Sequence, residues 1–294
     1  MEGTGAARGR LYTGPAGWSY RDWEGRVYPA GTGLDRLLHI DCVELNSSFY
    51  RTPSHRMVES WSERLSRIPD FSMNIKVLQR FTHEREFSRA ELDGFVRTFD
   101  PLWENGRLGA FLMQFPWSFR NIPENVSYIG DLASSFGDRP LCVEVRHGSW
   151  QTTGALSFFS DNGLCLCSID QPLVGDSLKP SATVTTPEFG YIRLHGRNRD
   201  NWFRKDAGRD ERYDYLYDEN ELNEWKSRAV EMLGKTRKLF IITNNHFQGQ
   251  ALVNALQLRS LIDERKIDVP PLLAESYPDL ARYAARGSSG FELS

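Results

Sequence analysis

Polar and charged side chains stand in, or just after, the last residues of several short apolar runs. Glu44 falls in the run 42–46, for example, and Lys76 ends the run 71–76. Because burying an unpaired charge costs several kcal/mol, charges in such runs indicate either a functional site or a network of ion pairs. The full set is Glu44, Asn46, Lys76, Gln114, Glu144, Arg146, Asp170, Arg193, His195, Asn244 and Asn245.

Two carboxylates in this set, Glu44 and Glu144, are candidates for acid–base catalysis, and paired carboxylates also suit glycoside hydrolysis. His195 is a candidate proton carrier. Together with Asp170, these residues offer the oxygen and imidazole ligands that Mg²⁺, Mn²⁺ or Zn²⁺ accept, although the sequence has no H-x-H or H-E-x-x-H spacing. We therefore take Glu44, Lys76, Glu144 and His195 as candidate catalytic residues and leave a divalent metal as an open alternative.

The basic residues of the set point to an anionic substrate. Arg146 and Arg193 can each bind a carboxylate or phosphate through two parallel hydrogen bonds. Lys76 can act as a Schiff-base nucleophile, but the carboxylates in the set favour a role as their charged partner. Neutral hydrogen-bonding groups for a substrate come from Asn46, Gln114, Asn244 and Asn245. The alternative is that acids and bases only neutralise one another in a structural network.

Aromatic residues make up 12 % of the chain, and some follow the apolar runs directly. Trp18 and Tyr20 come after the first run, and Tyr50 comes after the second. Packing between loops accounts for many aromatic side chains, but others can wall a pocket and stack on a sugar or a base. The candidate substrate-binding residues are Trp18, Tyr20, Asn46, Tyr50, Gln114, Arg146, Asp170, Arg193, Asn244 and Asn245.

The apolar runs alternate with longer runs of helical periodicity, which predicts strands joined by helices and paired in parallel. The predicted strands are 11–17, 42–46, 71–76, 108–114, 141–145, 164–169, 191–194 and 238–243. The predicted helices are 34–39, 56–67, 89–103 (capped by Ser88), 124–136, 155–162, 219–233 and 251–263. The segment 171–190 carries three prolines and no helical pattern, so the connection between strands six and seven is irregular.

Eight such units over about 250 residues predict an α/β fold with a single-domain TIM-type (β/α)8 barrel. Alternate strand residues face the barrel interior. Because the apolar set must face the helices, the polar set converges at the carboxyl ends of the strands, where such barrels place their sites. No Gly-rich phosphate turn follows the first run, so the sequence has no nucleotide-cofactor motif.

Several of these segments carry distinctive sequence motifs. They include Gly17-Trp18-Ser19-Tyr20, the stretch from Val43 to Arg51, Val143-Glu144-Val145-Arg146-His147, Arg193-Leu194-His195-Gly196, and Asn244-Asn245. In order and content, they resemble the YecE-like family, also called domain of unknown function 72, over about residues 11 to 262. The resemblance implies a TIM-type barrel, in agreement with the unit count. It implies no reaction, because the biochemical activity of the family is not established.

Composition limits the remaining possibilities. The net charge of -3 argues against a general nucleic-acid coat, and no apolar stretch reaches the 18 or so residues of a membrane span. The 4 cysteines form no C-x-x-C pair and lie in apolar runs, which favours reduced thiols and a cytoplasmic protein. We divide the chain into a disordered tail at 1–10, a barrel domain at 11–264 and a C-terminal extension at 265–294. The sequence does not indicate an oligomeric state.

Three functions fit these observations. The first is an enzyme that acts on a small polar or anionic substrate by acid–base or metal-assisted hydrolysis. The second is a barrel that binds or processes nucleic acid in the manner of a phosphodiesterase, which the net charge does not favour. The third is a non-catalytic barrel that binds a ligand.

Overall fold

The strands form two parallel sheets in the computed structural model, which describes residues 8–32, 39–202, 204, 206 and 208–285. The first sheet has the order β1 (Arg10–Pro15), β9 (Lys238–Thr243), β8 (Gly190–Leu194) and β7 (Ser168–Asp170). The second has the order β2 (Cys42–Leu45), β3 (Ser72–Lys76), β4 (Leu108–Gln114), β5 (Leu141–Glu144) and β6 (Cys165–Leu166). The prediction of an α/β fold with parallel strands is therefore confirmed.

The two sheets meet at two places without forming one continuous ladder. Cys167 alone separates β6 from β7, and its N–H donates to the carbonyl of Val143 at 2.9 Å. At the other junction, Ala16 and Glu44 form an isolated parallel bridge between the ends of β1 and β2. The predicted strands are present, with the sixth divided at Cys167, but the closed eight-stranded barrel is not confirmed.

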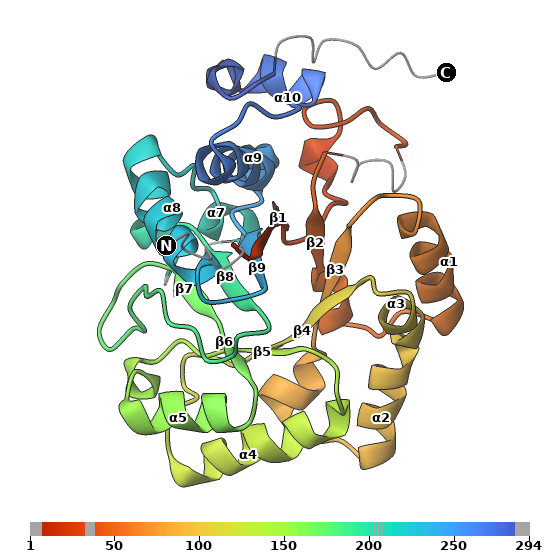
Figure 1. Cartoon of the computed structure of the whole chain (residues 1–294), viewed down its shortest axis with the longest axis vertical. Coiled ribbons are helices and arrows are strands. Elements are labelled where there is room, and N and C mark those ends of the chain that lie inside the picture. The colour runs from red at the N-terminus through yellow and green to blue at the C-terminus, as the bar shows by residue number, and fades with distance from the viewer. Residues whose placement is uncertain (1–7, 33–38, 203, 205, 207, 286–294) are drawn as a thin grey trace, which may run out of the picture.

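Helices cover the outer faces of the sheets (Figure 1). They are α1 (His55–Leu65), α2 (Arg89–Thr98), α3 (Asp100–Glu104), α4 (Pro123–Ala133), α5 (Thr153–Asp161), α8 (Glu219–Leu233) and α9 (Gln250–Asp263). Local chemistry sets where they begin: Ser88 caps α2 in a capping box with Glu91, as predicted for that start. Of the predicted helix 34–39, all but His39 lies outside the described residues, as does most of the predicted tail.

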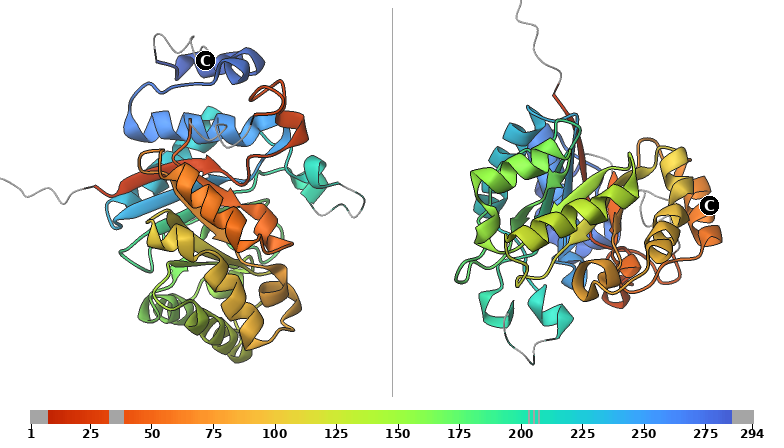
Figure 2. Two further views of the ribbon diagram at one scale, coloured as in Figure 1. Left: turned by 90° about the vertical axis from the view of Figure 1, so that its right-hand side faces the viewer. Right: turned by 90° about the horizontal axis from the view of Figure 1, so that it is seen from below.

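Two short helices follow β8, namely α6 (Arg199–Trp202) and α7 (Arg209–Arg212). Figure 2 shows this segment projecting from the end of the molecule opposite to the start of β1. After α9 the chain forms α10 (Pro271–Ser276) and a 3-10 turn. The segment 171–190 contains no helix, in agreement with the sequence. None of the helices in the described ranges is long and apolar enough to cross a membrane.

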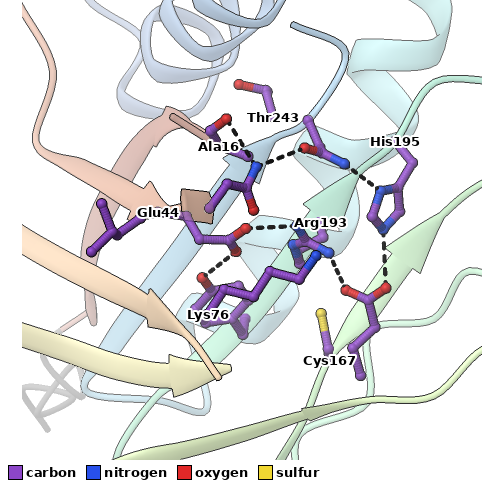
Figure 3. A network of polar contacts seen from close by, with 12 residues as sticks. Ala16, Glu44, Lys76, Cys167, Arg193, His195 and Thr243 are labelled. Carbon is purple, nitrogen blue, oxygen red and sulfur yellow. Dashed lines mark hydrogen bonds and ion pairs between the residues drawn. The ribbon is translucent and has the colours of Figure 1, made fainter. Parts of the chain in front are cut away.

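The strands alternate between an apolar and a polar face, and both are buried. On β3, Met73 and Ile75 belong to the hydrophobic core, whereas the buried Asn74 and the partly buried Lys76 belong to the other face. The same alternation places Glu44 of β2 and Arg193 of β8 on the polar face, where their side chains meet (Figure 3). The fold thus gathers charged groups between the two sheets, at the carboxyl ends of the strands.

Candidate functional site

Arg193 is the centre of a buried network of charged side chains (Figure 3). One terminal nitrogen of its guanidinium donates to Oε1 of Glu44 at 2.6 Å, and the other donates to Oε2 of Glu144. The Tyr191 hydroxyl donates to the second oxygen of Glu44 at 3.0 Å. Arg193 is 1 % exposed and both carboxylates are 0 % exposed, so the ion pairs are shielded from water.

Glu144 is held as an ion by two guanidinium groups. Besides Arg193, it accepts a hydrogen bond at Oε1 from Nε of Arg146 at 3.0 Å, and the same oxygen forms an ion pair with Nη2 of Arg146 at 2.8 Å. Burial alone would raise the pKa of this carboxyl, but the charges of Arg193 and Arg146 outweigh it and hold the pKa well below its usual range. The geometry therefore does not support the predicted use of Glu44 and Glu144 as an acid–base pair: Arg193 joins the two carboxylates, and Glu144 keeps its charge.

His195 is neutral, and its tautomer follows from its neighbours. The Asn244 amide nitrogen lies 3.0 Å from Nδ1, and Nε2 lies 3.3 Å from Oε1 of Glu144 and 3.4 Å from Nη2 of Arg146. An amide that donates to Nδ1 places the proton on Nε2, where the Glu144 oxygen accepts it. Burial lowers the pKa of His195 to about 3. Asn46 in turn lies 3.5 Å from the Asn244 oxygen and donates to the carbonyl of Ala16 at 3.1 Å. His195 is thus fixed in place and does not exchange protons near neutral pH.

Lys76 lies beside this network without joining it. Its Nζ is 4.1 Å from the centre of the Phe49 ring, and among the described residues no carboxylate comes within the 4.0 Å of an ion pair. Burial, followed by the positive charge of Arg193, lowers the pKa of Lys76 to about 7. The favoured role of Lys76 as charged partner of the carboxylates is therefore wrong, because Arg193 and Arg146 take that role.

A cavity of about 630 Å³ opens beside Lys76, and we call it the Lys76 cavity. Among the described residues, its wall contains the basic side chains of Arg21, Lys76 and Arg212 and no carboxylate. Six of the predicted site residues line it, and the full wall is Gly17, Trp18, Ser19, Tyr20, Arg21, Leu45, Asn46, Ser47, Tyr50, Lys76, Arg212, Tyr213, Asn244 and His246. An anion with a planar or polar body suits such a wall.

Gln114 and Arg146 line a second, smaller cavity of about 120 Å³. The indole of Trp202, on α6, forms part of this wall and also contacts His195, with 6.1 Å between the ring centres. The indole of Trp202 also contacts the ring of Tyr213, with 5.8 Å between the ring centres. Tyr213 lines the Lys76 cavity. Trp202 and His195 therefore lie between the two cavities.

Two predicted site residues face away from the network. Asp170 accepts hydrogen bonds from Nε of Arg197 at 2.9 Å and from the Trp225 indole of α8 at 3.1 Å, so it belongs to the helix side. The alternation of strand six was assigned in the wrong sense, because Cys167 is the residue that approaches Glu144 and Arg193 (Figure 3). Asn245 donates to the carbonyl of Tyr215 and to Asn254, both at 2.8 Å, and it likewise misses the cavity.

The residues proposed for a metal do not fit one. Glu44 and Glu144 are bound to arginines, and Asp170 lies on the helix side with Arg197. Within the described ranges, no three His, Cys, Asp or Glu side chains are gathered as a metal site. We therefore derive no chemistry through a metal held by Glu44, Glu144, Asp170 and His195.

Some residues of the cavity wall and of the buried network were not among the predicted site residues. Arg21 and Arg212 lie in short helical turns outside the strands, where no periodicity marks their direction. His246 follows Asn245 directly and stacks on Tyr20, with ring centres 4.6 Å apart. Tyr191 shares the polar face of β8 with Arg193, so its position followed from the alternation, although its hydroxyl was not counted as a site group.

The chain has relatives along most of its length. The family described as "Protein of unknown function DUF72" matches residues 12–278. The UPF0759 protein YunF of Bacillus subtilis (strain 168) is 31% identical over 272 residues, which are 86% of this chain and 95% of YunF. The UPF0759 protein YecE of Escherichia coli O157:H7 is 25% identical over 169 residues, which are 56% of this chain and 58% of YecE. A solved DUF72 family structure from Thermotoga maritima MSB8 is 33% identical and has a TM-score of 0.76, covering 86% of this chain and 99% of that chain.

Proposed function

Since the chain belongs to the DUF72 family, whose description states no reaction, we propose a function from its geometry: an enzyme that converts a small anionic substrate by acid–base chemistry in the Lys76 cavity. The single observation that carries this proposal is the position of Lys76. In the part of the chain that the structure describes, Lys76 lines a cavity whose wall holds three basic side chains and no carboxylate. Such a wall attracts an anion and brings it to a group that can give or take a proton.

The amine of Lys76 is suited to proton transfer because its pKa of about 7 keeps both protonation states populated near neutral pH. Hydrolysis, the reaction expected from the sequence, belongs to this proposal with the neutral amine as the base that accepts a proton from water. Asn46 and Asn244 offer amide groups to substrate hydroxyls, and Trp18 and Tyr50 offer ring faces. The buried ion pairs beneath the cavity hold these groups in place.

We also propose that the two sheets act as one interrupted TIM-type barrel. The bridge between Ala16 and Glu44 and the single residue Cys167 at the other junction support this interpretation. The cavity then lies at the carboxyl ends of the strands, the face at which TIM-type barrels place their sites. All 4 cysteines are free and buried, which supports a reducing, cytoplasmic compartment.

Binding of simple anions tests the proposed function. We expect inorganic phosphate and citrate to change the tryptophan fluorescence at low salt, because Trp18 lines the cavity. Arg21→Gln removes an exposed cation of the wall and should weaken binding by about tenfold, the worth of one charge-assisted hydrogen bond. Arg89→Gln is the matched control, since Arg89 is exposed on α2 and pairs with Asp93. The proposal fails if neither anion binds, or if both variants weaken binding equally.

A further inference from the structure

We propose that Lys76 is a covalent catalytic residue, which forms an imine with the carbonyl carbon of a small substrate that carries a carboxylate or phosphate. This inference rests on the proposed function and deepens it, because it names the substrate class and the bond that is made. In this reaction the neutral amine of Lys76 bonds to the substrate carbon, whereas in hydrolysis it would accept a proton from water.

The first support is the position of the amine. Lys76 is the last residue of β3, and it lines the Lys76 cavity. The Ser48 hydroxyl lies 2.6 Å from the main-chain oxygens of both Lys76 and Leu45, which ties the turn after β2 to the end of β3. The Phe49 ring then supports Nζ at 4.1 Å. A nucleophile held in this way loses little conformational freedom when it attacks.

The second support is that the nearby carboxylates do not neutralise Lys76. Glu44 and Glu144 give their close contacts to Arg193, and Glu144 also binds Arg146. An ion pair with either acid would keep the amine protonated and unreactive. Because Arg193 stands in that place, its positive charge acts against the ammonium form of Lys76, while the two acids favour it only from a longer distance.

The third support is the fraction of neutral amine. The pKa of Lys76 is lowered to about 7, first by burial and then by Arg193, so about half of this amine is neutral at pH 7. An ordinary lysine, with a pKa of about 10.4, is neutral in roughly one molecule of 2,500 at the same pH. The imidazole of His83 is edge-on to Phe49 and has a pKa lowered to about 4, so it adds no charge near neutral pH. Lys76 is therefore the amine best prepared to attack a carbonyl carbon.

The reaction balances without an oxidant or a reductant. The lone pair of Nζ forms a bond to the carbonyl carbon, the carbon–oxygen π bond breaks, and a proton moves from nitrogen to oxygen to give a carbinolamine. A second proton, taken from solvent, then converts the hydroxyl into a leaving water molecule, and the nitrogen lone pair forms the double bond of a protonated imine. Arg21 and Arg212, in the same wall, would hold the carboxylate or phosphate while the carbonyl group faces Nζ.

Reductive trapping tests this inference. The purified full chain is treated at pH 7 with glyoxylate, pyruvate or pyridoxal 5′-phosphate, together with sodium cyanoborohydride, and the adduct is located by peptide mass mapping among the seven lysines of the sequence. We expect Lys76 to be modified at least 100-fold faster than Lys226 and Lys235, which are ion-paired at the surface. The rate at Lys76 should rise with a midpoint near pH 7.

A variant and a binding measurement separate the possible failures. Lys76→Arg keeps the positive charge but cannot form an imine, so it should lose the adduct while phosphate still quenches the tryptophan fluorescence. If phosphate binds but no carbonyl compound modifies Lys76 faster than the surface lysines, the imine is overturned and the proposed function stands. If phosphate does not bind and Lys76 is not modified, both are overturned.

Discussion

The guanidinium of Arg193 and the carboxylate of Glu144 form an ion pair that is almost completely withdrawn from water, with exposures of 1% and 0%. Arg193 donates its second terminal nitrogen to Glu44, and Glu144 receives a second guanidinium from Arg146. Removing one member of such a chain leaves the others buried with uncompensated charge, which costs more than the pair itself contributes. The network therefore stabilises the residues that line the neighbouring cavity.

We expect Glu144→Gln to lower the free energy of unfolding by about 3 to 5 kcal/mol, because Arg193 and Arg146 then lose a carboxylate inside the protein. Urea unfolding at pH 7 measures the loss. Glu224→Gln is the matched control: Glu224 pairs with Arg197 and Arg228 but is half exposed, so its loss should stay below about 1 kcal/mol. Equal losses in the two variants would show that the network does not stabilise the fold in this way.

His195 should stay neutral throughout the range in which histidines usually titrate. Its pKa is lowered to about 3 by burial, and Asn244 holds the tautomer with the proton on Nε2. We expect the ¹⁵N and ¹³C ring shifts of His195, assigned with the variant His195→Gln, to remain constant from pH 8 to pH 5. A titration midpoint near 6.5 would show that water or a substrate reaches the ring, and it would restore His195 as a proton carrier.

The sequence revealed the strands well because each strand is a short apolar run bounded by polar residues. β4 and β9 have the predicted limits, and α8 matches its predicted range. The alternation along β2, β5 and β8 also predicted that Glu44, Glu144 and Arg193 would meet. A period of two along a strand determines the face of every side chain, so a few apolar positions are enough to place the charged ones.

For strand six, the period of two does not place the charged residue. Its two faces are both weakly apolar, with Cys167 on one and Leu166 on the other, so hydropathy could not decide which side Asp170 takes. The isolated bridge between Ala16 and Glu44 and the pairing of each charge also escaped prediction. They depend on distances between strands that are remote in the chain, and a count of acids and bases does not say which acid each base meets. The sequence therefore predicts the carboxylates as partners of Lys76, whereas in the structure Glu44 and Glu144 pair with Arg193.

Asp170 should affect stability and leave anion binding unchanged. Its carboxylate accepts from Arg197 and from the Trp225 indole, on the helix side of the sheet. We expect Asp170→Asn to lower the free energy of unfolding by about 1 to 3 kcal/mol, because the buried charge-assisted hydrogen bonds weaken. The dissociation constant for inorganic phosphate should change less than twofold. A tenfold weaker phosphate affinity in a folded variant would return Asp170 to the site.

Lys76 should destabilise the folded protein, and by an amount that depends on pH. In the unfolded chain this lysine keeps its proton up to a pH of about 10.4, whereas in the folded protein its pKa is lowered to about 7. Between these values the unfolded state binds more protons, so the contribution of Lys76 to stability rises with pH, and below pH 7 the folded protein carries the full cost of the buried ammonium. Replacing the charged group by a methionine of similar length removes that cost.

We therefore expect Lys76→Met to raise the free energy of unfolding by about 2 kcal/mol at pH 6, and by progressively less toward pH 9. Urea unfolding at several pH values measures the difference from the wild type. Lys226→Met is the control, because Lys226 is ion-paired with Glu264 on the surface and its replacement should have a small effect at every pH. A destabilised Lys76→Met variant at pH 6 would mean that the ammonium has a partner which compensates its burial, and the amine would then not be free to react.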